Sequence, residues 1–283
     1  MTDTSSIHAS SDAISNDLHR ITRVRHELKR RLLTVKRVTS VTPHMKRITL
    51  AGDDLDGFVS ASYDNHVKVF FPRPGEDEPL MPVFSEGRVL VDESARPIAR
   101  DYTPRRYDEA AQELDIDFAI HDAGPATTWA TQAKPGDKVG IGGPRGSFVV
   151  PDDFDWYLLI GDETALPAIG RRLKELRPAT RAIVIAEVAD PAEEQIFASK
   201  ASVTINWLHR GQQSAGSTTL MEDALRSLKL PVGDGYAFIA AESEVAKRLR
   251  KILVDERQHP KAWVKASGYW KGGAENYHEP HDD

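Results

Sequence analysis

The stretch ARDYTPRRY at residues 99–107 gathers three arginines, two tyrosines and a threonine around a single proline. Arg100 offers a planar fork of donors that suits a pyrophosphate, and Tyr102 offers a ring face for stacking. Thr103 offers a hydroxyl that can donate to or accept from a ring nitrogen. Side chains two apart on a strand share a face, so Arg100 and Tyr102 can point the same way. The stretch predicts a site for a flat aromatic ring joined to phosphates, although an exposed basic strand end fits it equally well by itself.

A second stretch, HDAGPATTWA at residues 121–130, favours the ligand interpretation. Gly124 and Pro125 turn the chain tightly, and small residues then open a short helix. A helix N-terminus with accessible N–H groups is a ready anion site. Trp129 could pack under the turn or stack on a ring, and we favour packing. His121 could touch a phosphate or a ribose, although a lone histidine is more often structural.

The composition limits the chemistry that the chain can perform. Its 283 residues, 40% of them apolar, suggest one large domain or two ordinary ones. Acidic residues outnumber basic ones by 43 to 37, and the net charge of −6 argues against general nucleic-acid binding. The absence of cysteine excludes disulfides, thiolate zinc sites, a cysteine nucleophile and iron–sulfur clusters held by protein thiolates. The ten histidines show no spacing typical of a metal site, so we expect none.

The N-terminal segment is polar and lacks the pattern of a secretory signal. No stretch approaches the ~20 apolar residues that span a bilayer. We therefore expect a cytoplasmic protein with no stable membrane insertion. Residues 1 to about 13 are expected to be disordered. A basic amphipathic helix packed on its own domain should follow, because these apolar residues fall at helical spacing: Ile14, Leu18, Ile21, Val24 and Leu28.

Short strand-like runs, separated by glycine, proline and aspartate, fill the chain from about residue 32 to residue 150. They read LLTVKRVTSV, MKRITLAG, HVKVFFP, ELDIDFAIH and DKVGIGG. Several short strands with regular turn signals indicate an antiparallel barrel or sandwich.

The pattern changes between Pro151 and Asp155. The runs WYLLIG, RAIVIAEV, VTINWLH, YAFIAA and AWVKAS then alternate with helical stretches such as SEVAKRLRKILVDER. Strands alternating with helices predict a parallel sheet covered on both faces. An all-β domain followed by an α/β domain suits an enzyme with two substrates and an active site in the crevice between the domains.

Two glycine-containing stretches compete as nucleotide sites. In GIGGPRGSF, at residues 140–148, the spacing is wrong and Pro144 interrupts it, so it better fits the closing strand and turn of the barrel. In LLIGDETALPAIGRRL, at residues 158–173, a buried strand ends at Gly161 and a helix begins near Thr164, which favours a nicotinamide nucleotide. Asp162 and Glu163 would repel phosphates, so we expect them to cap the helix or bind ribose while backbone amides and Thr164 meet the phosphates.

The segment ASGYWKGGAENYHE, at residues 266–279, places two large aromatic residues and a lysine just after the last strand. Tyr269 or Trp270 could cover a flat ring, line a substrate mouth, or simply anchor the segment on the barrel. Lys271 is expected at the surface, where it can meet an anion.

Six motifs in order resemble the siderophore-interacting protein family: DNHVKVFFP, RDYTPRRYD, DIDFAIHDAGPATTWA, PGDKVGIGGPRGSF, GDETALPAIGRRL and SGYWKGG. This family comprises flavin-dependent, NAD(P)H-dependent ferric-siderophore reductases, and the chain is most similar to its cytoplasmic NADPH-dependent ferric-chelate reductases. The similarity runs from about residue 28 to residue 278. It implies a ferredoxin-reductase-like fold, with an N-terminal tail and helix over residues 1–27. An antiparallel FAD-binding β-barrel should follow over residues 28–152, and a parallel-sheet NAD(P)-binding α/β domain over residues 153–283.

The resemblance also assigns ligand-binding residues. The FAD-binding positions would be His66, Arg100, Asp101, Tyr102, Thr103, Asp117, Phe118, Ile120, His121, Gly124, Ala126, Thr127, Thr128 and Trp129. The NAD(P)-binding positions would be Gly161, Asp162, Glu163, Thr164, Ala165 and Leu166; the family carries this acidic sequence where ferredoxin reductases show Gly-Thr-Gly. Lys68 and Lys271 would lie at the mouth for the anionic iron chelate, and Tyr269 and Trp270 would cover the flavin ring.

The resemblance implies that NADPH or NADH passes a hydride to FAD, which reduces Fe(III) one electron at a time, with no catalytic side chain. Three alternatives stay open: a free-flavin reductase, a siderophore reductase driven by ferredoxin, and a non-catalytic iron-chelate binding protein. Arg171, Arg172 and Arg210 could each meet the 2′-phosphate of NADPH, and the sequence does not select among them.

Overall fold

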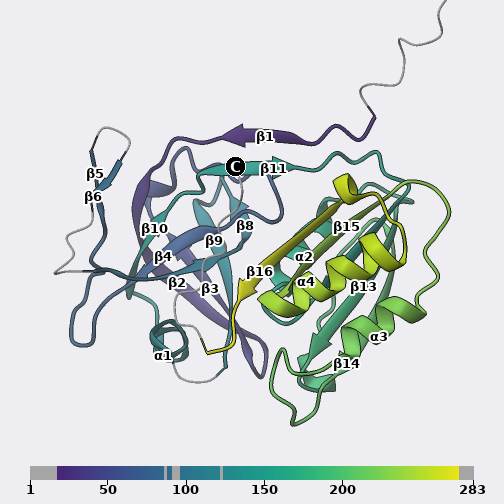
Figure 1. Cartoon of the computed structure of the whole chain (residues 1–283). Coiled ribbons are helices and arrows are strands. Elements are labelled where there is room, and N and C mark those ends of the chain that lie inside the picture. Colours follow the sequence, from purple (N-terminus) through teal and green to yellow (C-terminus); the bar gives the residue numbers. More distant parts are fainter. Residues whose placement is uncertain (1–17, 86–87, 91–95, 122–123, 274–283) are drawn as a thin grey trace, which may run out of the picture.

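The computed structural model describes residues 18–85, 88–90, 96–121 and 124–273. It contains a barrel and a parallel sheet flanked by helices, side by side (Figure 1). The barrel sheet has the strand order β7-β4-β10-β2-β3-β9-β8. Its strands are β2 (Arg30–Thr42), β3 (Met45–Ala51), β4 (Val67–Phe71), β7 (Ile98–Tyr102), β8 (Pro104–Asp108), β9 (Glu113–Ala119) and β10 (Lys138–Gly142).

The two edge strands of this sheet, β7 and β8, are consecutive in the chain and only Thr103 separates them. The Cα atoms of Tyr102 and Pro104, two positions apart in the chain, cannot lie more than ~7 Å from each other. The opposite edges of the sheet must therefore meet at Thr103, and the sheet closes into a barrel there. The antiparallel barrel expected from the sequence is confirmed.

The barrel core follows the two-residue alternation of its strands. On β9, Leu114, Ile116 and Phe118 point into the core and are almost fully buried. The intervening acidic residues of β9 point outward, where arginines and a lysine pair with them. The helix α1 (Pro125–Gln132) covers one end of the barrel and contributes Ala126 and Ala130 to its core.

The second sheet is parallel, with the order β14-β13-β12-β15-β16. One face packs on helix α2 and on the barrel, and the other packs on helices α3 and α4. Its elements are β12 (Trp156–Gly161), α2 (Leu166–Glu175), β13 (Arg181–Val188), β14 (Ser202–His209), α3 (Leu220–Ser227), β15 (Gly235–Glu242), α4 (Ser243–Lys251) and β16 (Val264–Trp270). The parallel sheet covered on both faces is thereby confirmed.

Two small antiparallel pairs complete the fold: β1 (Thr22–Arg25) with β11 (Gly146–Val149), and β5 (Val83–Ser85) with β6 (Arg88–Leu90). The prediction of a helix around residues 14–28 is wrong where the structure describes it. Residues 22–25 form β1 because the edge of β11 offers backbone partners, and this non-local pairing overrides the helical spacing. Leu18 and Val24 are 69% and 40% exposed, and Ile14 lies outside the described residues. In the part of the chain that the structure describes, no helix is long and apolar enough to cross a membrane.

Polar side chains join the barrel to the second sheet. Arg171 of α2 donates to the carbonyl oxygen of Ser60 at 2.6 Å and to that of Pro104 at 3.1 Å. Glu193 is 7% exposed and accepts from the Thr42 hydroxyl at 2.5 Å and from the His44 backbone at 3.0 Å. The buried Glu193 carboxylate therefore accepts hydrogen bonds from two residues of the barrel and fixes the position of the barrel relative to the parallel sheet.

We expect Glu193→Ala to lower the stability of the protein by about 1–3 kcal/mol, because it leaves the buried Thr42 hydroxyl and the His44 backbone N–H without their acceptor. Glu194→Ala is the matched control, since Glu194 is exposed and pairs only with His209 among the described residues. Thermal unfolding followed by circular dichroism measures both variants. Equal midpoints for the two variants would show that Glu193 does not hold the interface.

Candidate active site

The closure of the barrel places Tyr102 and Thr103 at the junction with the parallel sheet. Thr103 is 6% exposed, and its side chain contacts that of Tyr269 of β16. Burial raises the pKa of Tyr269 well above its usual range, so the hydroxyl stays protonated and can donate. The barrel seam is therefore tied to the last residues of the second sheet.

Tyr102 lies on an aromatic cluster at the end of the barrel. Its ring centroid lies 4.3 Å from that of Phe118, and Trp129 of α1 lies 5.9 Å from Phe118 and 5.3 Å from Phe71. Trp129 thus packs beneath α1. The cluster fixes α1 against the strand that carries Tyr102.

The N-terminus of α1 is suited to an anion. Gly124 occupies the N-cap position, no side chain caps the helix, and its first turn contains no acidic residue. Among the described residues, the first N–H groups of α1 therefore have no competing side-chain acceptor. Thr128 and His121 are exposed beside this turn, whereas Ala126 is buried. Ile120 packs on the barrel core.

The strand pairing of β4 with β7 brings further expected residues together. Val67 lies opposite Tyr102, and Lys68 lies opposite Asp101 with its Nζ 2.8 Å from the carboxylate. His66 is exposed at the start of β4, and Arg100 donates to the Ala99 carbonyl oxygen at 2.8 Å. Lys68, which we expected at the mouth for the anionic iron chelate, thus forms an ion pair with Asp101.

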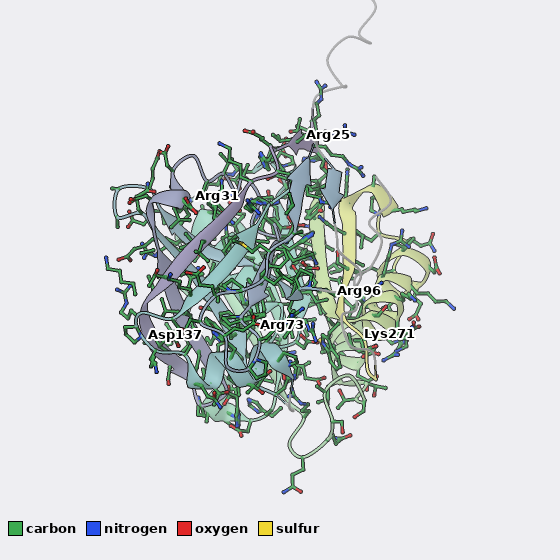
Figure 2. The ribbon with its side chains drawn as sticks, turned by 90° about the vertical axis from the view of Figure 1, so that its left-hand side faces the viewer. Arg25, Arg31, Arg73, Arg96, Asp137 and Lys271 are labelled. Atoms are coloured by element: carbon green, nitrogen blue, oxygen red, sulfur yellow. The ribbon has the colours of Figure 1, made fainter. Side chains whose placement is uncertain are left out.

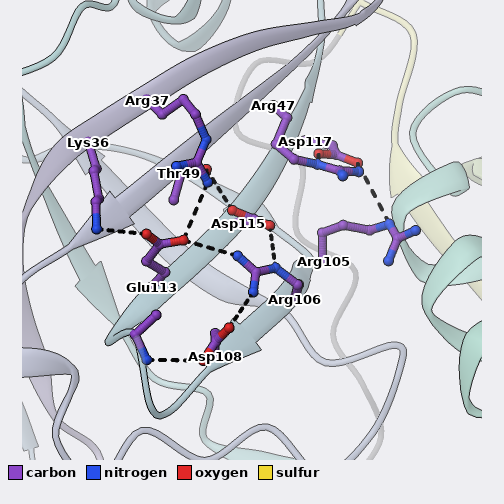
Figure 3. Close-up of polar contacts among 11 residues, drawn as sticks. Lys36, Arg37, Arg47, Thr49, Arg105, Arg106, Asp108, Glu113, Asp115 and Asp117 are labelled. Atoms are coloured by element: carbon purple, nitrogen blue, oxygen red, sulfur yellow. Dashed lines mark hydrogen bonds and ion pairs between the residues drawn. The ribbon is translucent and has the colours of Figure 1, made fainter.

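The structure does not bring Asp117 to the same side as Phe118, because adjacent residues of β9 point to opposite faces. Arg47 holds the Asp117 carboxylate with Nε and Nη2 at 2.6 and 2.8 Å, and Arg105 lies beyond it (Figure 3). The side chain of Asp117 is paired with Arg47 and Arg105 on the barrel wall. Only the backbone of Asp117 can therefore contact a ligand on the Tyr102 side.

The turn expected to bind the nicotinamide nucleotide, residues 161–166, is called the nucleotide turn and follows β12, the middle strand of the parallel sheet. The chain leaves β12 toward β13 on one side, and β15 joins on the other, which makes the end of β12 the topological switch point where ligands bind in such sheets. A Cβ atom on Gly161 would collide with Ala165 and with the Ala240 carbonyl oxygen, so this position requires glycine. Ala165 and Leu166 are fully buried in the core, and only their backbone can reach a ligand.

Asp162 is 2% exposed and links the turn to the end of β16. Its Oδ1 accepts from the Thr164 N–H at 2.9 Å and from the Thr164 hydroxyl. Its Oδ2 accepts from the Trp270 indole at 2.8 Å and from the Glu242 backbone at 3.2 Å. Burial and the charge of Glu163 raise the pKa of Asp162 to about 6, against the opposite effect of the Thr164 and Trp270 hydrogen bonds. Asp162 therefore shapes the turn and positions Trp270.

Of the three arginines that could meet a 2′-phosphate, Arg210 is the one that lies beside the turn at residues 161–166. Arg210 follows β14 and holds the Glu163 carboxylate in a bidentate pair at 2.9 and 2.5 Å. Arg171 is committed to the barrel interface. Arg172 is 6% exposed and lies over the rings of Tyr63 and Tyr157.

Lys271 is exposed after β16, and its charge helps to lower the pKa of Glu244 on α4. It lies in the side view of Figure 2 next to the end of the parallel sheet. The Gly272 N–H reaches the Glu242 carboxylate at 3.4 Å. Trp270 and Gly272 are thus both anchored, which fixes the backbone on either side of Lys271.

Sequence reasoning missed two contacts, Thr103 with Tyr269 and Asp162 with Trp270. The ends of β12 and β16 lie at the same edge of a parallel sheet, which is a signal that they could meet. The strand order, with β15 between them, is not readable from the sequence.

The geometry defines a class: an antiparallel barrel followed by a parallel sheet covered by helices, which is the fold of the ferredoxin reductases. A ferredoxin reductase of carbazole 1,9a-dioxygenase shares this fold with a TM-score of 0.60 at 14% identity, covering 86% of this chain and 70% of that chain. The model of the siderophore-interacting FAD-binding domain matches residues 34–148, and that of siderophore-interacting protein matches residues 154–273. The chain belongs to the siderophore-interacting protein family.

Named relatives agree with this assignment. The chain is 40% identical over 253 residues to the NADPH-dependent ferric-chelate reductase of Escherichia coli, covering 88% of this chain and 95% of the relative. It is 34% identical over 254 residues to a ferric vibriobactin reductase of Vibrio cholerae, covering 88% and 93%. A siderophore utilization protein from T. fusca superimposes with a TM-score of 0.86 at 39% identity, covering 92% of this chain and 99% of that chain.

We predict that Asp162→Asn destabilises the protein by about 1–3 kcal/mol, although it removes a buried charge. The amide nitrogen cannot accept, so either the Thr164 donors or the Trp270 and Glu242 donors lose their acceptor. Asp190→Asn is the control, because Asp190 caps an exposed turn with a single bond to the Ala192 N–H at 2.7 Å. Thermal unfolding and tryptophan fluorescence measure the effect. A gain in stability for Asp162→Asn would contradict the role of Asp162 as a hydrogen-bond hub.

Proposed function

We propose that this chain is a flavoenzyme that oxidises NAD(P)H and reduces ferric siderophores or related ferric chelates, from which Fe(II) is released. The observation that carries the proposal is the position of two consecutive residues. Tyr269 contacts Thr103 in the barrel, and Trp270 contacts Asp162 in the nucleotide turn. The two half-sites therefore lie close together, and transfer between two rings needs reacting atoms ~3–3.5 Å apart.

The residues at the barrel seam fit an FAD molecule. Arg100 and the N–H groups that open α1 would hold the pyrophosphate, since both favour anions. Tyr102 would face the isoalloxazine, Thr103 would bond its edge, and Tyr269 would lie beside the ring. FAD, when bound, supplies hydride acceptance from NAD(P)H and one-electron donation to Fe(III).

The nucleotide turn would hold NAD(P)H by its backbone. Glu163 is neutralised by Arg210, so the turn does not repel a phosphate as strongly as its sequence suggests. A 2′-phosphate would compete with Glu163 for the Arg210 guanidinium, which would favour NADPH over NADH.

Ferric siderophores are commonly anionic, and Lys68 and Lys271 would contribute positive charge at the mouth of the chelate site. We keep the expected domain boundary at residues 152–153 and the cytoplasmic location as predictions.

A steady-state assay tests this function. Purified protein, loaded with FAD, is mixed with NADPH under anaerobic conditions and either a ferric chelate or free FMN, and Fe(II) is captured by a chromogenic chelator. We expect two Fe(II) per NADPH with the ferric chelate and a much lower rate with FMN. Turnover with FMN alone would indicate a free-flavin reductase, and chelate binding without NADPH oxidation would indicate a carrier.

We predict that Thr103→Val lowers kcat/KM for the ferric chelate roughly tenfold, the effect of losing one buried hydrogen bond of about 1.4 kcal/mol. Thr103→Ser keeps the hydroxyl and should stay close to the wild type. The FAD affinity of each variant, measured by fluorescence quenching, separates a loss of binding from a loss of rate. Equal activity of the valine and serine variants would show that the hydroxyl plays no part.

A further inference from the structure

Arg105 is a positively charged residue of the barrel seam that the proposed reaction does not use. It is 15% exposed, its Nε is fully buried without a hydrogen-bond partner, and its nearest carboxylate oxygen is Oδ2 of Asp117 at 3.8 Å. Asp117 already receives two hydrogen bonds from Arg47. A guanidinium has five N–H donors, and leaving such donors unmade in a buried position is costly.

The backbone directs Arg105 to this place. Pro104 pairs with Ile116 and Arg106 pairs with Asp115, so Arg105 is the extra residue of a β-bulge in β8. Bulges re-aim side chains and are common beside functional sites. In Figure 3 the Arg105 guanidinium extends away from Arg106 and its carboxylate partners.

Arg105 reaches helix α2 at a glycine. A Cβ atom on Gly170 would lie 2.9 Å from Nη2 of Arg105 and 2.8 Å from the Phe197 ring. The guanidinium and the ring therefore both rest against the backbone of α2. The neighbouring Arg106 differs from Arg105 in that its guanidinium donates hydrogen bonds to three carboxylates, those of Asp115, Asp108 and Glu113.

A cavity of about 340 Å³ opens at this point between the two domains. Its lining comprises Val41, Arg47, Arg105 and residues 194–197. One water needs only ~15 Å³ on this measure, so a hydrated anion fits. Exposed Glu194 and Ile196 form part of its lining, and the Glu194 carboxylate is paired with His209 at 2.9 Å.

Two arginines, Arg47 and Arg105, line the cavity together with one carboxylate, that of Glu194. The charges of Arg47 and Arg171 both act on Arg105, and the Arg47 Nη1 has no acceptor among the described residues. Arg171 is neutralised by Glu175 at 2.8 Å and Arg47 by Asp117. Arg105 has the longer of the two ion pairs with Asp117, at 3.8 Å against 2.6 Å for Arg47.

We propose that this interdomain cavity binds a small phosphate-bearing anion, with Arg105 as its principal ligand and Arg47 as the second. The planar fork of a guanidinium matches two phosphate oxygens. The site is distinct from the flavin seat, since Thr103 turns to Tyr269 on β16 whereas Arg105 turns to α2 and Phe197. A bound anion would join the barrel to the segment at residues 194–197 and stabilise the domain contact.

Thermal unfolding of the FAD-loaded protein tests the proposal, with inorganic phosphate compared against chloride at equal ionic strength. At ten times its Kd, phosphate should raise the melting temperature by about 3–6 °C. Arg105→Gln should abolish this shift. The same variant should melt at the wild-type temperature or higher without phosphate, because it removes a desolvated charge whose nearest carboxylate, Asp117, is already held by Arg47. A purely structural arginine would instead give a lower melting temperature.

The matched control is Arg37→Gln, which removes a charge from the same barrel wall but from a half-exposed guanidinium bonded to Thr49 and Glu113. It should keep the phosphate shift. Absence of a shift in the wild type, or an equal shift in Arg105→Gln, would overturn the proposal. So would a shift seen without FAD but lost on loading FAD, because the anion would then occupy the flavin seat.

Nucleotides distinguish the two sources of the phosphate group. If NADP⁺ removes the phosphate shift and NAD⁺ does not, the site takes the 2′-phosphate of the nucleotide. If the effects of NADP⁺ and phosphate add, the site takes a free anion. The measurement needs no turnover, so its outcome is independent of the proposed reductase activity.

Discussion

Two adjacent residues at the end of β16 tie the two halves of the site together. The Tyr269 side chain contacts Thr103 at the barrel seam, and the Trp270 indole donates to Asp162 in the turn at residues 161–166. A strand advances only ~3.3 Å per residue. The barrel seam at Tyr102 and Thr103 and the turn at residues 161–166 therefore cannot move apart unless one of these contacts breaks. In a reductase of this family, such a constraint would keep donor and acceptor within transfer distance.

The same seam explains why functional side chains gather where the barrel closes. One residue joins the two edges of the sheet, so the strands on either side of Thr103 must twist sharply to meet. Tyr102 is turned onto the aromatic cluster below α1. The bulge that follows turns Arg105 outward, toward α2, and leaves Arg106 in the ladder of ion pairs on the barrel wall. Barrel closure thus separates three neighbouring side chains into three environments.

Much of the fold could be predicted from the sequence. Buried parallel strands read as continuous apolar runs, and WYLLIG corresponds to β12 residue for residue. Residues 22–25 were mistaken for a helix because their partner, β11, lies more than a hundred residues away and pairing with it cannot be read locally. At the site, the motif around Tyr102 and Thr103 and the turn at Gly161 could be located. The partners of Asp162, Arg171 and Arg172 could not, because they depend on strand order and on how the two domains dock.

The most direct test of the central claim is an anaerobic titration of the FAD-loaded protein with NADPH, followed at the flavin absorption band. One NADPH should bleach one flavin, and addition of a ferric chelate should restore the yellow colour. A protein that binds both FAD and NADPH, as measured by calorimetry, but whose flavin stays oxidised would contradict the claim that the end of β16 holds the two half-sites within transfer distance.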